Sequence, residues 1–212
     1  MSQPCDRACT IPVPGKVDSS LGEFWVENPW EIVKHGHNLS CFERNRTWMN
    51  LGGSNFLDLS YLTGTDSDGD GRCVVAGDFR NDGRQELLVR QAGGGALLLF
   101  ENNFPQRHYL KVSLRGRQSN RLGVGARLRA VVNGQQLVRE MFPVNSFQSQ
   151  MSNLVHFGLG DAERVERLEV RWPSGKIQVL ADINADRHIV VDEGGEGAAA
   201  VETVVPGRTV RP

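Results

Sequence analysis

Long apolar runs are absent from this chain of 212 residues. No segment approaches the roughly 20 consecutive apolar residues that a membrane-spanning helix requires. The opening residues, MSQPCDRACTIPVPGK, also lack the basic and apolar stretches of a secretory signal. We therefore expect no membrane span, and a chain that is cytoplasmic, already processed or exported by another route.

The chain also lacks an excess of charge of either sign and has little cysteine. Its net charge is -1, which gives no reason to expect binding to nucleic acid. Its cysteines are Cys5, Cys9, Cys41 and Cys73, and none forms the Cys-x-x-Cys pairs of a zinc site. A disulfide or an inert thiol is the expected state of each.

The common catalytic motifs are missing. Neither G-x-S-x-G nor H-E-x-x-H occurs, and the glycine-rich strings GVGARL and GLGDAE lack the third glycine of a dinucleotide-binding loop. His35 and His37 form an H-x-H pair that can bind zinc or iron, but no third ligand is evident nearby. A pair of surface loop histidines is the favoured interpretation. Catalysis by residues dispersed along the chain stays open.

Turn residues and short alternating segments are what the chain does contain. It has 24 glycines and 9 prolines between short runs rich in β-branched residues, which indicates an all-β chain. In HYLKVSLRG, Leu110, Val112 and Leu114 alternate with polar residues and predict one buried strand face. Asn133-Gly134 predicts a two-residue hairpin, and the PSG of residues 173–175 predicts another turn. Seven or so such strands predict a β-sandwich.

The same patterns divide the chain into four parts. Residues 1–37 are predicted to form an irregular arm, and residues 38–106 a compact strand–loop–strand unit. Residues 107–193 carry the sandwich strands. Residues 194–212 are predicted to be a flexible tail with little capacity to form a core.

Several strings together resemble known families. NLGGSNFLDLS, DGRCVVAGDFRNDGRQELLV and LLLFENN resemble an FG-GAP/VCBS repeat, the calcium-loop blade of integrin-like β-propellers. SNRLGVGARLRAVV, LVREM, FQSQ, LVHFGLGD, LEVRWPSGKIQVL and IVVDE resemble the ASPIC/UnbV domain that accompanies such repeats in cartilage acidic protein and bacterial relatives. The resemblance runs roughly from Asn38 to Glu193.

This resemblance implies an all-β architecture: one FG-GAP/VCBS-like propeller-blade unit followed by an ASPIC/UnbV β-sandwich. It implies a binding or structural role, as in cell adhesion, in an extracellular or periplasmic setting, and it brings no established catalytic mechanism. A single blade leaves open strand edges. Either its own sandwich or other chains must cover them.

The first of two acidic loops is TDSDGDGR. Asp66, Asp68 and Asp70 alternate as in a calcium loop, whose ligands are carboxylates at alternate positions and a later closing acid. The ninth position of this loop is Val74 and its twelfth is Gly77, so the closing acid is missing. A solvated acidic turn is the favoured interpretation of this loop.

The second acidic loop, DFRNDGRQE, fits a blade-type calcium loop better. Asp78, Asp82 and Glu86 occupy its first, fifth and ninth positions, and the carbonyl of Arg84 can serve at the seventh. Arg80 stands at the third position, where a ligand is usual. The guanidinium of Arg80 either replaces the cation by pairing with the carboxylates, which we favour, or flanks a bound calcium. A hybrid site with carboxylates from both loops is a third alternative.

Basic residues cluster in the middle of the chain. No acid occurs between Glu101 and Glu140, whereas the basic residues there are Arg107, Lys111, Arg115, Arg117, Arg121, Arg127, Arg129 and Arg139. Several share a strand face, so one sheet surface should be basic. The alternatives are a solvated face, an internal dock for the acidic segment, and a site for an anionic polymer.

Polar residues inside the sandwich segment raise one further question. His156 lies within the apolar string VHFGLG, and we expect it to hydrogen-bond to the polar run NSFQSQ of residues 145–150. That run either satisfies backbone groups in a bulge or loop, which is favoured, or lines a small-ligand groove.

Taken together, these features predict a non-catalytic β module for protein–protein or glycan contacts, with calcium as a candidate stabiliser. Self-association through open blade edges is one candidate interaction. The alternative is a metal-dependent accessory enzyme in a biosynthetic pathway, suggested by the acidic loops and the H-x-H pair. A structural subunit of a larger assembly is a third candidate.

Overall fold

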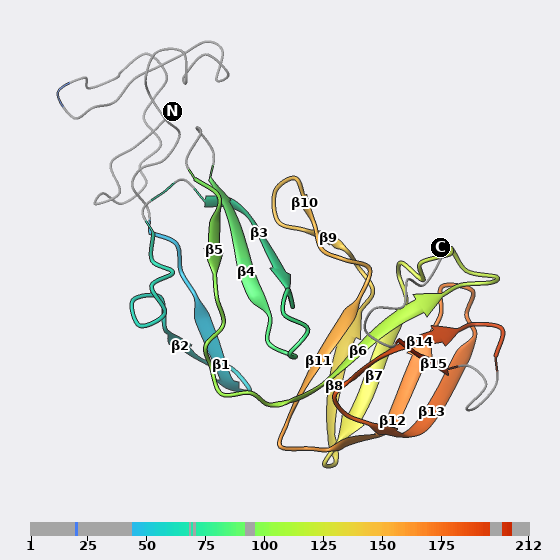
Figure 1. Cartoon of the computed structure of the whole chain (residues 1–212). Coiled ribbons are helices and arrows are strands. Elements are labelled where there is room, and N and C mark those ends of the chain that lie inside the picture. Colours follow the sequence, from blue (N-terminus) through green and yellow to red (C-terminus); the bar gives the residue numbers. More distant parts are fainter. Residues whose placement is uncertain are drawn as a thin grey trace, which may run out of the picture. The chain divides into compact units, whose positions relative to one another are not determined.

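The computed structural model describes residues 44–67, 69, 71–91, 96–195 and 201–204, together with Ser20. These residues form strands, turns and irregular segments, which confirms the all-β prediction (Figure 1). This described part contains no helix that is long and apolar enough to cross a membrane. The chain divides into two units: Met1–Val74 with Leu88–Phe100, and Val75–Leu87 with Glu101–Pro212.

Two four-stranded sheets make up most of the second unit. The first sheet has the order β11-β6-β14-β15, and its strands are β11 (Val155–Gly160), β6 (His108–Arg115), β14 (Arg187–Asp192) and β15 (Val201–Val204). The second sheet has the order β13-β12-β7-β8, and its strands are β13 (Ile177–Asn184), β12 (Arg164–Arg171), β7 (Arg127–Val132) and β8 (Gln135–Glu140). Side chains from both sheets form one buried apolar cluster, as in a β-sandwich.

Alternation along β6 determines which of its faces joins this core. Leu110, Val112 and Leu114 are buried in the cluster, as their spacing predicts. β6 lies between β11 and β14, antiparallel to β11 and parallel to β14. The other face of β6, which begins at Tyr109, is the face that meets the acidic loop described below.

The predicted turns form as expected. Asn133 and Gly134 have φ angles of 48° and 73° and join β7 to β8, with Val132 paired to Gln135. Positive φ at both central residues is the conformation that Asn-Gly favours in a tight hairpin. Gly175, with a φ of 90°, lies in the turn between β12 and β13.

The segment predicted as a flexible tail, residues 194–212, contains one strand among its described residues. Val201–Val204 forms β15 and pairs antiparallel with β14. The side-chain pattern of this segment did not predict the strand. The strand depends on the backbone edge of β14, which offers hydrogen bonds to any extended segment.

The described part of the first unit contains small sheets. β1 (Trp48–Gly52) pairs with β2 (Asn55–Asp58) as a hairpin. A three-stranded sheet has the order β3-β4-β5, formed by β3 (Gly71–Gly77), β4 (Glu86–Gln91) and β5 (Leu98–Phe100). β3 and β4 continue into the second unit, so the loop between them belongs to that unit. The propeller-blade assignment of this segment stays a prediction.

A short hairpin accounts for the polar run NSFQSQ. β9 (Val144–Asn145) pairs with β10 (Ser149–Gln150), and Ser146 and Gln148 between them have positive φ. The hydroxyls of Ser146 and Ser149 lie 2.7 Å apart. The run is therefore a tight hairpin in which Ser146 and Ser149 contact each other.

Candidate functional site

The acidic loop, residues 78–86, closes around the carboxylate of Asp78. Its Oδ1 accepts the N–H of Asp82 at 3.0 Å, and its Oδ2 accepts the N–H of Gly83 at 2.7 Å. Asn81 and Gly83 have positive φ, which allows the chain to curl back over the aspartate. Asp78 therefore organises the loop from within.

A lysine from the sandwich supplies the charge opposite Asp78. Lys111, on β6, places its Nζ 2.5 Å from Asp78 Oδ2, and the two side chains are only 5% and 2% exposed. The same amine lies 3.4 Å from the side-chain oxygen of Asn81. Burial alone raises the pKa of Asp78, but the hydrogen bonds from Lys111 and Gly83 outweigh it and the net pKa is lowered. Asp78 is thus an ionised carboxylate in a buried pair.

The other carboxylates of the loop have arginine partners. Asp82 Oδ2 accepts from Nε and Nη2 of Arg84 at 3.1 and 2.5 Å, and this side-chain contact is the main reason that its pKa is lowered. Glu86 Oε1 lies 3.7 Å from Arg80 Nε, and Arg80 Nη2 lies 2.9 Å from Glu101. Arg80 therefore pairs with carboxylates, as favoured from the sequence, but those of Glu86 and Glu101. Asp78 and Asp82 are paired with Lys111 and Arg84.

Further polar contacts of the loop involve backbone groups. Glu86 Oε2 accepts the N–H of Phe79 at 2.9 Å. Glu86 is 2% exposed, and its Oε1 is buried without a hydrogen-bond partner, 3.7 Å from the Arg80 guanidinium. The carbonyl of Asp82 accepts from Gln106, and Asn102 donates to the carbonyl of Gln85. The segment after β5 is thereby tied to the loop.

The outer face of the β11-β6-β14 sheet contacts the loop. His156 and His188 are the cross-strand neighbours of Lys111 on its two sides. The rings of Tyr109 and His156 stack with centroids 5.9 Å apart, and a Cβ at Gly83 would collide with the Tyr109 ring. The basic strand face predicted from the sequence is, at Lys111, an internal dock for the acidic loop.

His156 has a different partner from the predicted one. Its Nε2 lies 3.0 Å from the carbonyl of Gly83, so Nε2 carries the proton that it donates. Burial lowers the pKa of His156, so the neutral ring is favoured. The predicted bond to the run 145–150 is wrong, because β11 presents His156 to the acidic loop.

The calcium ligands predicted from the sequence were Asp78, Asp82, the Arg84 carbonyl and Glu86 in the second loop, and Asp66, Asp68 and Asp70 in the first. Asp66 accepts hydrogen bonds from Arg44 through its carbonyl and Oδ2 at 3.0 and 3.1 Å. Asp68, Asp70 and the H-x-H pair lie outside the described residues. Cys73 is a half-buried free thiol. Within the described residues, no three His, Cys, Asp or Glu side chains are grouped closely enough to hold a metal ion.

These residues do not fit calcium in the arrangement seen. Calcium takes six to eight oxygen ligands, whereas each loop carboxylate has an oxygen facing a lysine or arginine. A divalent ion at Asp78 would stand beside the buried ammonium of Lys111. The sequence offered Lys111 only as one of several clustered basic residues and did not single it out as this competitor, because Lys111 lies on a strand outside the loop.

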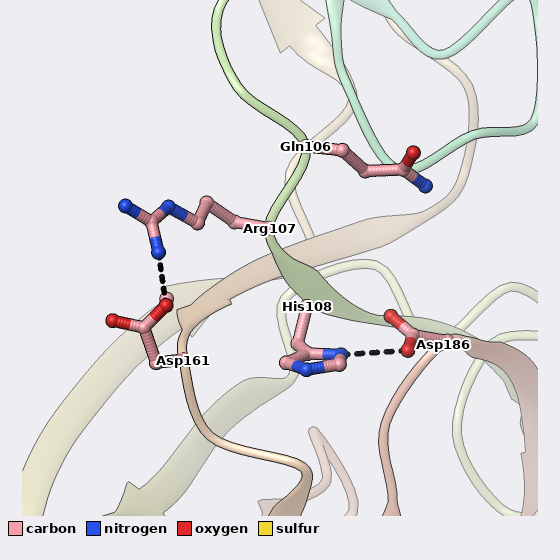
Figure 2. A pocket seen from close by; sticks show the side chains of 6 residues that line it. Gln106, Arg107, His108, Asp161 and Asp186 are labelled. Atoms are coloured by element: carbon pink, nitrogen blue, oxygen red, sulfur yellow. Dashed lines mark hydrogen bonds and ion pairs between the residues drawn. The ribbon is translucent and has the colours of Figure 1, made fainter.

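Figure 2 shows a small polar pocket elsewhere in the second unit. It encloses about 170 Å³ and is lined by Gln106, Arg107, His108, Gly160, Asp161 and Asp186. His108 Nδ1 lies 2.7 Å from Asp186 Oδ2, and Arg107 forms an ion pair with Asp161. The lining contains no serine, threonine, cysteine or lysine nucleophile, so the His–Asp pair is assigned no reaction.

A buried carboxylate outside both sites was also not predicted. Glu193 is 2% exposed and accepts the backbone N–H groups of Arg117, Gln118 and Ser119. The hydroxyls of Ser119 and Ser174 donate to its other oxygen at 2.8 and 2.6 Å. The residues that donate to Glu193 lie in distant segments of the chain, so local spacing could not predict this site. The WPSG and IVVDE strings of the resemblance, which contain Ser174 and Glu193, were the available signal.

Comparison with known proteins connects this second unit to a described family. No curated protein matches the chain. Residues 116–198, which contain the Glu193 site and strands β7 to β14, match the family described as ASPIC and UnbV.

Proposed function

We propose that the chain is a non-catalytic β module that binds a partner protein through the β1–β2 hairpin. The observation that carries this proposal is the exposure of that hairpin's large apolar side chains. Trp48 is 57% exposed, Leu51 60% and Phe56 56%, and Met49 and Leu57 are exposed as well. Large apolar side chains left exposed on a surface mark candidate interaction sites.

The distribution of the core supports the same function. Every member of the buried apolar cluster belongs to the second unit. The hairpin has five exposed residues in β1 and three in β2, so it buries few of its own side chains. An isolated two-stranded hairpin is marginally stable in water. A partner that covers it supplies the missing burial.

The FG-GAP/VCBS resemblance fits this proposal. A blade of such a propeller packs its faces against neighbouring blades. We assign the first unit as one repeat of this type, with other protein chains or further copies covering its apolar side chains. The UnbV-like sandwich then serves as the stable platform that carries the repeat.

Light scattering and pulldown on the native chain and on Trp48→Ser/Phe56→Ser test the function. The expected result is self-association or retention of a defined partner by the native chain, with at least a tenfold loss of affinity in the variant, since buried aromatic anchors dominate interfaces. Ile177→Ser is the matched control, because Ile177 is an exposed apolar residue of β13 in the other unit. A strictly monomeric native chain that retains no protein, or a partner held equally by the variant, would refute the proposal. Binding only on a glycan array would also refute it.

A further inference from the structure

We propose that the ammonium of Lys111 is the resident cation of the acidic loop, so that the loop closes and docks on the sandwich without calcium. The contact between Lys111 Nζ and Asp78 Oδ2 at 2.5 Å is the central observation. The ion pair joins residues 78–86 to the central strand β6 within the second unit. It is present whether or not the β1–β2 hairpin binds a protein.

Three donors already occupy most of the roughly four lone-pair sites of the Asp78 carboxylate. Oδ1 accepts from the N–H of Asp82, while Oδ2 accepts from both the N–H of Gly83 and the Lys111 ammonium. A calcium ion bound to Oδ2 at its usual distance of about 2.3–2.6 Å would lie within a few ångströms of that ammonium. Both side chains are almost fully buried, so water screens little of the repulsion between the two cations.

Lys111 cannot readily leave to admit a metal. It lies on β6, which is hydrogen-bonded on both sides by β11 and β14, and its neighbours across the sheet are His156 and His188. Its Nζ also lies 5.2 Å above the ring of Tyr109, a favourable position for a cation. An ammonium removed from Asp78 but kept in this environment would be a buried unpaired charge, which is strongly disfavoured.

Arg80 has a different role from the one its loop position suggests. It replaces a usual calcium ligand, but its guanidinium contacts Glu86 and Glu101. Arg80 therefore removes one calcium ligand from the loop, while Lys111 on β6 supplies the positive charge that neutralises Asp78. Two independent features of the chain thus oppose calcium in this loop.

A double-mutant cycle tests the pairing on the full-length chain. We expect Lys111→Met and Asp78→Asn each to lower the thermal midpoint by roughly 10 °C, because each leaves a buried partner uncompensated. The double variant should lose much less than the sum of the two single losses, so its thermal midpoint should be well above the additive value. Arg127→Met, which removes a cation from an exposed position of β7, is the control and should change the midpoint little. Additive losses would overturn the proposal.

Thermal unfolding with added calcium tests whether this loop binds the metal. Free calcium is raised to about 10 mM, above the dissociation constants of weak protein sites, after treatment with a chelator. We expect calcium to shift the thermal midpoint of the native chain by no more than it shifts the midpoint of Asp78→Asn. A stabilisation of the native chain that Asp78→Asn loses would overturn the proposal, because a ligand of the folded state must raise its midpoint.

Amine labelling keeps the test decisive if Lys111→Met does not fold. In the native chain, Lys111 should react with an acylating reagent much more slowly than the half-buried Lys176, with or without calcium. Asp78→Asn should accelerate labelling of Lys111 by roughly tenfold, because the buried ion pair is gone. Equal labelling of the two lysines in the native chain, or calcium-dependent labelling of Lys111, would contradict the assignment.

Discussion

At the scale of single residues, Glu193 shows how one buried carboxylate connects separate parts of a sandwich. Its oxygens receive three backbone N–H groups from residues 117–119 and hydroxyls from Ser119 and Ser174. Burial raises the pKa of Glu193, but these donors, led by the Ser174 hydroxyl, lower it to about 2. The ionised carboxylate is therefore the form that the fold stabilises.

This lowered pKa predicts acid sensitivity. The ordinary pKa of this carboxyl is 4.5 and its folded value is about 2, so its contribution is complete above pH 4.5 and is lost as the pH falls toward 2. The contribution is on the order of 3 kcal/mol, at 1.36 kcal/mol per pKa unit. Urea unfolding of the native chain and Glu193→Gln across this range measures it.

The stability difference between the native chain and Glu193→Gln should be large at neutral pH and should shrink toward pH 2. Asp161→Asn is the control, since the side chain of Asp161 is 84% exposed. A difference that does not change with pH would show that Glu193 contributes through shape and not through its charge.

Gly83 provides a second prediction at this scale, with Gly134 as its matched control. Both have positive φ, of 89° and 73°, but a Cβ at Gly83 would collide with the ring of Tyr109, whereas nothing lies near Gly134. Gly134→Ala should cost about 1 kcal/mol for the backbone conformation alone. Gly83→Ala should cost roughly 2–3 kcal/mol or more, because steric overlap adds to that strain. Equal costs in urea unfolding would show that the loop does not rest on Tyr109.

At the scale of strands and loops, the sequence predicted what depends on neighbouring residues. Alternation in HYLKVSLRG identified the buried face of β6, and Asn133-Gly134 identified the β7–β8 hairpin with its register. Long-range pairings were not predicted. The parallel contact of β6 with β14 and the strand β15 depend on backbone edges that side-chain patterns do not encode.

The candidate site was predictable to a similar extent. Spacing within DFRNDGRQE placed Asp78 and Glu86 at ligand positions of a calcium loop and predicted that Arg80 pairs with acids. In the structure Asp78 pairs with Lys111, and Arg80 contacts Glu86 and Glu101. The spacing within the loop could not single out Lys111, which the sequence offered only as one of several basic residues that could dock the acidic segment. Lys111 is buried because the acidic loop folds over it. The alternation of residues within β6 cannot predict that contact.

The edge strand β15 leads to a prediction for the first sheet. Deleting residues 196–212 removes the backbone partner of β14, whereas deleting residues 205–212 leaves β15 in place. We expect the longer deletion to accelerate amide hydrogen exchange in 188–191, since unpaired strand edges open more easily. Exchange in β12 and β13 should not change. Equal exchange in both truncated chains would show that β15 does not protect β14.

At the scale of the whole molecule, the family match and the folded unit do not coincide. The match covers residues 116–198 and begins after β6, which lies at the centre of the first sheet. The acidic loop, which neutralises Lys111 on β6, lies still earlier in the chain. The smallest self-sufficient piece should therefore begin before the acidic loop.

Three fragments test this expectation: 116–198, 101–212 and 75–212. We expect the first to lack fixed tertiary structure, because it has lost Leu110, Val112 and Leu114 from the core. The second should fold with a lower midpoint than the third, since it leaves Lys111 and the outer sheet face without the acidic loop. The near-ultraviolet circular dichroism of Trp172, which is 2% exposed, reports the packing. A well-packed 116–198 fragment would contradict this account.

The parallel pairing of β6 with β14 also bears on the order of events during synthesis. β6 leaves the ribosome early, but its neighbour at 187–192 is made only after β7 to β13. Contacts between distant segments form slowly, because a long loop must close first. Lys111 and the acidic loop can form their ion pair soon after both are synthesised. This contact would cover the polar face of β6 until β14 is synthesised. A nascent chain stalled before residue 187 should therefore be the form most dependent on chaperones.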